Sequence, residues 1–212
     1  MLLDGTVYSR AVLAGQKHSE LLLPMVQAVL AEADLALSQV DAIAVGQGPG
    51  SFTGLRIGCG VAQGLAFGAS LPVVEVITLE AMAAYALKDA ASGGVVACLD
   101  ARMNEVYAAI YEKSVSGLHT ASEPGLYAPG QAPLPEGDMV YLGCGSGFIG
   151  YSAILAERYA GRLARVAPEM HPHAEAIARL AADKWQAGDF VAAESVEPLY
   201  IRDKVALKTC ER

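Results

Sequence analysis

Gly46-Gln-Gly-Pro-Gly-Ser-Phe-Thr-Gly54 joins a short apolar stretch, Ala42–Val45, to a longer apolar segment that is itself rich in glycine. Glycines allow the positive φ of a tight turn, and a serine or threonine can cap a helix. The backbone N–H groups and the helix dipole would then point at one place, the general form of a phosphate site. The alternative is a tight strand-to-helix turn that binds nothing. The candidate loop residues are Gly46, Gly48, Gly50, Ser51, Thr53 and Gly54.

This loop departs from two known phosphate motifs. No Lys-Ser or Lys-Thr pair follows the glycines, as it would in a P-loop, and Ser51 stands where a dinucleotide fingerprint has its third glycine. Pro49 also removes one N–H donor. The residues alone therefore leave both interpretations open, an anion cradle and a tight turn.

The segment 51–68 is predicted to form a helix with two rows of small residues at a spacing of four. One row is Gly54, Gly58 and Ala62, and the other is Gly60, Gly64 and Gly68. Glycine costs about 1 kcal/mol against alanine inside a helix, so close packing must offset that cost. We expect one row to face the core and the other a partner helix, the alternative being a buried core helix. Arg56 and Gln63 argue against a membrane span.

Composition sets the outer bounds. The chain has 212 residues, 53% of them hydrophobic and 18% charged, with a net charge of -8, which is typical of a soluble globular protein. An acidic balance disfavours direct nucleic-acid binding, since that binding relies on lysine and arginine. The four cysteines are scattered without a C-x-x-C pair and no secretory leader opens the chain, so we expect a cytoplasmic protein with buried, unpaired thiols.

The first residues predict an incomplete sheet. Asp4-Gly5 is a hairpin signal and Thr6–Leu13 has strand character, but only Met1–Leu3 precede the turn. We expect this first arm to be too short to pair, so that an N-terminal strand is missing from the chain.

A helix is predicted over His18–Ala33, with an apolar stripe that includes Leu22, Met25, Val26 and Val29. The stripe is wider than the roughly 100° that one core requires. This width predicts burial on two sides, or a central helix inside a single large core.

The remainder of the chain predicts a second αβ unit. After a strand at 73–77 and a helix at 79–87, strands are predicted at 95–100 and 106–112, followed by a segment that is mostly loop and short strand at 114–138. Tyr141–Phe148 then repeats the strand, glycine turn and helix order of the first loop, which indicates two tandem halves. A helix at 174–187 and a strand at 196–201 complete the prediction.

The pattern of chemical groups indicates no catalytic centre. The histidines include no pair at a spacing of four, because the residue four positions after His18 is Leu22. We expect both imidazoles of His171-Pro172-His173 to be exposed. Asp100 is the best carboxylate candidate for a cation, although a turn hydrogen bond is the interpretation we favour. We therefore expect no metal, no cofactor and no catalytic residue.

Three blocks of this sequence closely resemble the TsaB family, also called YeaZ. These are GQGPGSFTGLRIGCGVAQGLAFG, LDARMNEVYAAIY and VEPLYIRDKVALK, and the resemblance extends over nearly the whole chain from Asp4. It implies an actin-like fold (ASKHA, ribonuclease H-like) of two αβ lobes, each a mixed sheet with flanking helices. We expect lobes at 1–99 and 100–195, with a C-terminal segment at 196–212 that packs back on the first lobe.

The resemblance also implies a role in making N6-threonylcarbamoyladenosine in tRNA, next to the anticodon. The family member resembles an inactive paralogue of TsaD, the transferase subunit, which it binds and activates through its first two helices. TsaE, an ATPase, joins them, and without partners a homodimer is expected. The contact residues inferred on this basis are Leu22, Met25, Val26, Val29, Arg56, Gly60, Gln63, Gly64 and Phe67.

The sequence departs from the resemblance at its start, because the family's first strand ends in Asp-Thr and this chain lacks it. The alternative function is an autonomous actin-fold ATPase or small-molecule kinase that uses both glycine loops for phosphate. A protease has no support, since no metal site or nucleophile-base pair can be identified.

Overall fold

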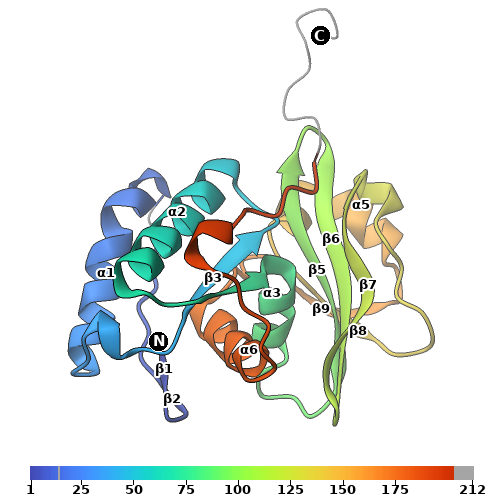
Figure 1. The fold of residues 1–212 in the computed structure, drawn as a ribbon. Coiled ribbons are helices and arrows are strands. Elements are labelled where there is room, and N and C mark those ends of the chain that lie inside the picture. The colour runs from blue at the N-terminus through green and yellow to red at the C-terminus, as the bar shows by residue number, and fades with distance from the viewer. Residues whose placement is uncertain (14, 203–212) are drawn as a thin grey trace, which may run out of the picture.

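The computed structural model describes residues 1–13 and 15–202, which form a small N-terminal hairpin, a two-stranded sheet and a five-stranded sheet with helices around them (Figure 1). The helices are α1 (His18–Glu32), α2 (Phe52–Ala69), α3 (Thr78–Ala86), α4 (Gly147–Gly150), α5 (Ser152–Arg158) and α6 (Ala174–Gln186). The strands are β1 (Leu2–Leu3), β2 (Thr6–Val7), β3 (Ile43–Gly48), β4 (Val73–Ile77), β5 (Gly93–Arg102), β6 (Glu105–Ser114), β7 (Gly117–Tyr127), β8 (Tyr141–Cys144) and β9 (Leu163–Ala167).

The chain begins with a small hairpin. β1 pairs with β2 across Asp4-Gly5, where both residues have positive φ, and Met1 and Tyr8 exchange backbone hydrogen bonds of 2.7 and 2.9 Å. The prediction that the first arm is too short to pair was therefore wrong. The predicted strand Thr6–Leu13 was too long, because β2 ends at Val7 and, after Tyr8, residues 9–13 pair with no described strand.

The first sheet contains two parallel strands, β3 and β4. Helix α2 packs on one face through Cys59, Ala62 and Ala66, while α3 and α6 cover the other face. Val73 of β4 also exchanges two backbone hydrogen bonds with Val191, which protects that edge. β3 pairs with β4 alone among the described residues, and its other side borders a cavity. This sheet thus presents α2 on the outer side of the molecule, beside α1 (Figure 1).

Helix α2 matches its prediction closely because both of its ends carry local signals. Ser51 is the N-cap and accepts a 3.4 Å hydrogen bond from the N–H of Gly54. Ser70 ends the helix in the left-handed conformation, and Pro72 follows. The predictions for β4, α3 and α6 are also confirmed to within a residue or two.

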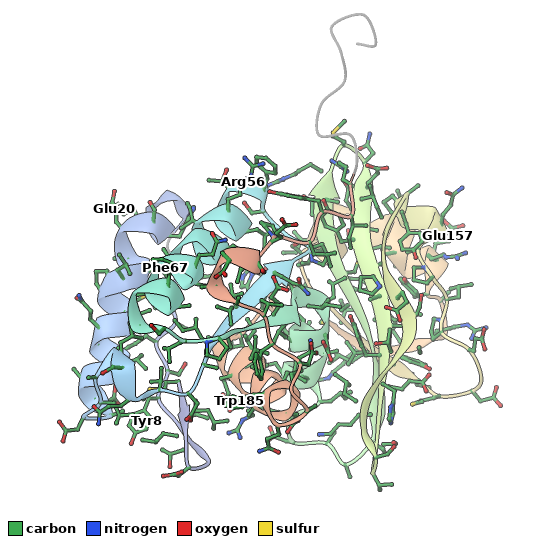
Figure 2. All side chains as sticks on the ribbon, in the orientation of Figure 1. Tyr8, Glu20, Arg56, Phe67, Glu157 and Trp185 are labelled. Atoms are coloured by element: carbon green, nitrogen blue, oxygen red, sulfur yellow. The ribbon has the colours of Figure 1, made fainter. Side chains whose placement is uncertain are left out.

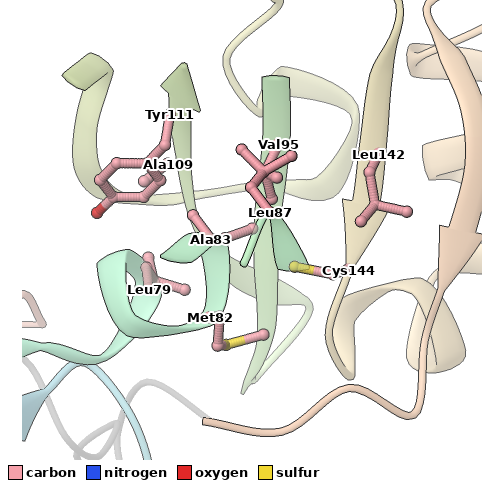
Figure 3. Close-up of a cluster of buried hydrophobic side chains, with 10 residues drawn as sticks. Leu79, Met82, Ala83, Leu87, Val95, Ala109, Tyr111, Leu142 and Cys144 are labelled. Atoms are coloured by element: carbon pink, nitrogen blue, oxygen red, sulfur yellow. The ribbon is translucent and has the colours of Figure 1, made fainter. Parts of the chain in front are cut away.

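The second sheet has five strands in the order β7-β6-β5-β8-β9. β5 alternates between the two faces, since Val95 and Ala97 pack toward α3 and Val96 and Cys98 toward α4 and α5. The α3 side of this core is shown in Figure 3. Its members are Leu79, Met82, Ala83, Leu87, Val95, Ala97, Ala109, Tyr111, Leu142 and Cys144.

Two strands of this sheet were missed or underestimated. β7 extends over 11 residues where the sequence predicted loop and short strand, and Pro124-Gly125 lies at a register shift against β6. β9 was not predicted, since its three middle positions are all exposed and its burial does not alternate.

The C-terminal segment 196–201 is not a strand, contrary to the prediction. It crosses the molecule as an extended chain, with the N–H of Glu197 bonded to Glu75 and that of Leu199 bonded to the carbonyl of Gln47. Pro198 between them has no N–H to give, so a regular ladder cannot form. Arg202 ends the described chain against the β5–β6 turn, bonded to Glu105 and to the carbonyl of Arg102.

Among the described residues, no helix combines the length and the apolar character needed to cross a membrane.

The ionised carboxylate of Glu80 on α3 destabilises this fold. Burial raises its pKa, Lys184 opposes the rise, and Asp189 and Glu123 reinforce it. A raised pKa means that the folded state holds the proton more tightly than the unfolded state does. The contribution of Glu80 to stability is then greatest at low pH and is lost as pH rises through the folded pKa.

We expect Glu80→Gln to remove this loss. Its melting temperature should exceed that of the parent by a margin that widens between about pH 4 and about pH 8. Glu157→Gln removes the same charge from an exposed site on α5 (Figure 2) and is the control. If the two variants show the same margin, net charge is responsible and the burial of Glu80 is not.

Candidate interaction surface and glycine loops

The two small-residue rows of α2 face in different directions. In the inner row, Ala62 is 5% exposed, and a Cβ on Gly58 would lie 4.0 Å from Val45. In the outer row, a Cβ on Gly60, Gly64 or Gly68 would meet no atom within 4 Å. One row therefore packs on the core, as predicted, and the other is open to the surroundings.

The open row lies beside large exposed side chains. Phe67 is 77% exposed and Arg56 is also exposed, and Figure 2 shows both on α2. Gln63 is different, because it is half-buried and its Nε2 donates a 3.1 Å hydrogen bond to the carbonyl of Val196. The structure thus brings Arg56, Gly60, Gly64 and Phe67 to one surface, which we call the α2 surface, while Gln63 anchors the C-terminal segment.

Helix α1 borders the α2 surface, and none of its 15 residues is buried. Its four predicted contact residues are half-buried and line a cavity of about 480 Å³ between α1, β3, α6 and the first hairpin. These residues are Leu22, Met25, Val26 and Val29. The outward side of the helix carries Leu23, which is 44% exposed, and Pro24. Apolar side chains are therefore present on both sides of α1.

The first glycine loop is filled by the chain itself. Gly48 has a φ of +124°, and a Cβ there would lie 2.9 Å from the carbonyl oxygen of Leu199. The N–H of Leu199 donates a 2.7 Å hydrogen bond to Gln47 in the same loop. A Cβ on Gly46 would lie 3.2 Å from Ile177. These contacts support the tight-turn interpretation over the anion cradle.

The other loop residues have local roles. Ser51 caps α2 because its hydroxyl accepts a hydrogen bond from the N–H of Gly54. A Cβ on Gly50 would make only ordinary contact with Leu55, at 3.8 Å. Thr53 is exposed.

The second glycine loop is filled in the same way. A Cβ on Gly145 would overlap the carbonyl oxygen of Cys98, and one on Gly147 would overlap its Sγ. Between them, the hydroxyl of Ser146 accepts a 3.1 Å hydrogen bond from the N–H of Asp100. Both loops therefore use glycine to let another part of the same chain approach.

The groups that could carry chemistry are dispersed. The carboxylate of Asp100 accepts a 2.7 Å hydrogen bond from the N–H of Arg102, which is the turn role we favoured. The prediction that His173 is exposed was wrong, because its ring stacks on that of Tyr85 with centroids 4.2 Å apart and the residue is half-buried. No group of three or more histidine, cysteine or acidic side chains is placed to hold a metal ion within residues 1–13 and 15–202.

The cysteines follow their prediction where the structure describes them. Cys59, Cys98 and Cys144 are free and buried, and Cys210 lies outside the described residues. Burial raises the pKa of Cys98 and of Cys144 to about 12. A raised pKa keeps both thiols protonated near neutral pH, which disfavours a nucleophilic role for either.

One feature of the α2 surface was missed from sequence. Phe52 and Tyr200 gather around Arg56, with their ring centroids 5.8 Å apart. The spacing of four between Phe52 and Arg56 could have indicated that pair, because both lie on one helix face. Tyr200 gave no signal, since it is 144 residues away from Arg56.

Comparisons with known proteins agree with this fold. Residues 11–209 match a family model described as TsaD, tRNA N6-adenosine threonylcarbamoyltransferase. The tRNA threonylcarbamoyladenosine biosynthesis protein TsaB of Escherichia coli is 37% identical over 97% of this chain and 89% of its own length. Its Haemophilus influenzae counterpart is also 37% identical, over 92% of this chain and 84% of its own length.

A solved structure, YeaZ from Pseudomonas aeruginosa, superimposes with a TM-score of 0.86 at 38% identity, covering 94% of this chain and 91% of that one. Another structure, titled as an uncharacterized protein with similarity to peptidase YEAZ from the same organism, also gives a TM-score of 0.86. The mixed sheets and flanking helices define an actin-like fold. Within that class, the chain belongs to the TsaB (YeaZ) family.

The packing at the second glycine loop is open to a direct test. We expect Gly147→Ala to destabilise the protein by about 1 to 3 kcal/mol, because the new methyl group would overlap Cys98 Sγ in a filled core. Gly150→Ala is the matched control three residues away, where the nearest atom lies 3.9 Å from the new Cβ. Urea unfolding of both variants measures the difference, and equal stability would show that the loop does not need its glycine.

Proposed function

We propose that this chain is a non-catalytic scaffold subunit in the formation of N6-threonylcarbamoyladenosine in tRNA, where it binds and activates a TsaD-like transferase through α1 and α2. The open glycine row of α2 carries this proposal. Three glycines in the helix cost about 1 kcal/mol each against alanine, and no contact within the described residues requires them. A partner helix that packs against the row would offset the cost.

The rest of the surface supports the same proposal. Exposed Phe67 and half-exposed α1 offer apolar area beside the glycine row, and glycines let two helix backbones approach closely. The names of the family relatives place those proteins in threonylcarbamoyladenosine biosynthesis. We also propose a TsaE-like ATPase as a further partner, a homodimer through the same surface when the chain is alone, and a cytoplasmic location. Contact with tRNA would run through the transferase, because the net charge is -8.

The alternative is an autonomous actin-fold ATPase or small-molecule kinase, and the glycine loops disfavour it. Leu199 lies against Gly48 in the first loop, and Cys98 lies against Gly147 in the second. A phosphate in either loop would have to displace a part of the core. Calorimetric titration of the isolated chain with ATP measures this directly, and saturable binding would revive the alternative.

The proposed interface predicts the behaviour of Gly60→Leu. We expect this variant to bind the TsaD-like subunit of the same cell at least about 100-fold more weakly, because the leucine keeps the helices apart. Its own fold should be retained, since the new side chain meets no atom and leucine favours helix. Light scattering coupled to size exclusion shows whether the variant alone keeps the size of the parent and whether it forms the complex. Calorimetry measures the affinity.

Ala164→Leu is the matched control, because it adds an exposed leucine on β9, in the sheet away from α2 (Figure 1). It should bind as the parent does. Parental affinity in Gly60→Leu would mean that the glycine row does not contact the transferase.

A further inference from the structure

Arg56 is held in place on the α2 surface by two aromatic rings. Its guanidinium carbon lies 3.9 Å from the ring centroid of Phe52 and 5.8 Å from that of Tyr200. Its Nε donates a 2.8 Å hydrogen bond to the hydroxyl of Tyr200. The two rings remain 42% and 47% exposed, so the cluster lies open on the surface.

The charge of Arg56 has no counterpart in the part of the chain that the structure describes. Other arginines form ion pairs with carboxylates, as Arg102 does with Asp100 and Arg179 with Glu175. No carboxylate of the described chain forms an ion pair with Arg56, and its hydrogen bond uses only Nε. The outer edge of the fork, with Nη1 and Nη2, is therefore open to an acceptor.

The position of Arg56 does not serve the stability of the helix. It is the fifth residue of α2, close to the positive end of the helix dipole, where a cation is unfavourable. Ordering an arginine side chain also costs rotamer entropy. The rings and the Tyr200 hydroxyl offset part of these costs and leave the fork pre-ordered, which favours recognition of a planar oxyanion.

The cluster continues the α2 surface. Phe52, Arg56, Gly60 and Gly64 follow one another at a spacing of four, and Phe67 comes three residues later, so all five share one side of the helix. We propose that Arg56 is the charged anchor of the partner interface and binds a carboxylate side chain of the TsaD-like subunit, end-on through Nη1 and Nη2. This inference rests on the proposed function.

A protein carboxylate is favoured over a nucleic-acid phosphate. Binding to a polyanion requires several cations together, whereas Arg56 is flanked by aromatic rings and glycines. Arg202, which follows Tyr200 in the same segment, is 11% exposed and already paired with Glu105. A single pre-ordered arginine between aromatic residues is typical of a protein–protein hot spot.

Affinities of point variants for the TsaD-like subunit test the anchor. Arg56→Gln should weaken binding about 10- to 100-fold, the effect of losing charge-assisted hydrogen bonds, and the loss should shrink between about 0.05 and about 0.5 M salt. Arg56→Lys, which keeps the charge and loses the fork, should fall between Arg56→Gln and the parent. Tyr200→Phe keeps the ring and removes the hydroxyl that orients the guanidinium, so it should weaken binding by a smaller factor.

Arg165→Gln is the matched control, since Arg165 is an exposed arginine on β9, and it should bind like the parent. Parental affinity in both Arg56 variants, while Gly60→Leu prevents binding, would overturn the anchor and leave the proposed function standing. Failure of the parent itself to bind the subunit would overturn the proposed function. If the Arg56→Gln loss appeared only when the assembled complex was titrated with tRNA, a phosphate would be the occupant and the carboxylate anchor would be wrong.

Discussion

The close approach of Leu199 to Gly48 is the contact on which the geometry of the α2 surface depends. A carbonyl oxygen can lie 2.9 Å from the place of a Cβ only because residue 48 has none. That approach fills the first glycine loop, so the turn is part of the core. It also directs the next residue, Tyr200, toward Arg56 at the start of α2. The absence of a side chain at Gly48 therefore lets the segment 196–201 pass close to the loop, and that path fixes the geometry of the α2 surface.

Helix α2 divides its small residues between two tasks. Cys59, Ala62 and Ala66 let it pack closely on the first sheet, where their burial contributes to stability. On the other side, no described atom lies within 4 Å of where a Cβ on Gly60 or Gly64 would be, and both glycines lower the helix propensity. A helix that serves only its own domain would carry alanine or a polar residue at those positions. The preference of helices for residues other than glycine is therefore violated at the positions where we propose that a partner binds.

The elements with strong local signals were predictable from sequence, and those that depend on distant pairing were not. α2 has a capping serine and a left-handed serine at its end, and β4 is a short apolar run closed by the start of α3. The β1–β2 hairpin was rejected because its length argued against pairing. β9 depends on its ladder with β8, which no alternation in its own residues reveals.

The candidate surface shows the same division. The orientation of the two glycine rows follows from a helical period, so the sequence could predict it. The filling of the loops by Leu199 and Cys98 could not be predicted, because these contacts join residues far apart in the chain. Tyr200 was assigned to a strand, whereas its extended segment is fixed by single hydrogen bonds to Gln47 and Arg56.

The absence of any buried residue in α1 links binding to folding. A helix held only by half-buried side chains opens at a lower free energy than the rest of the domain, so its amide protons should exchange with solvent before those of α2 and α3. A partner that covers α1 would raise that opening free energy by mass action, in proportion to the logarithm of its concentration over Kd. The lifetime of this chain against cellular proteases would then follow the supply of its partner.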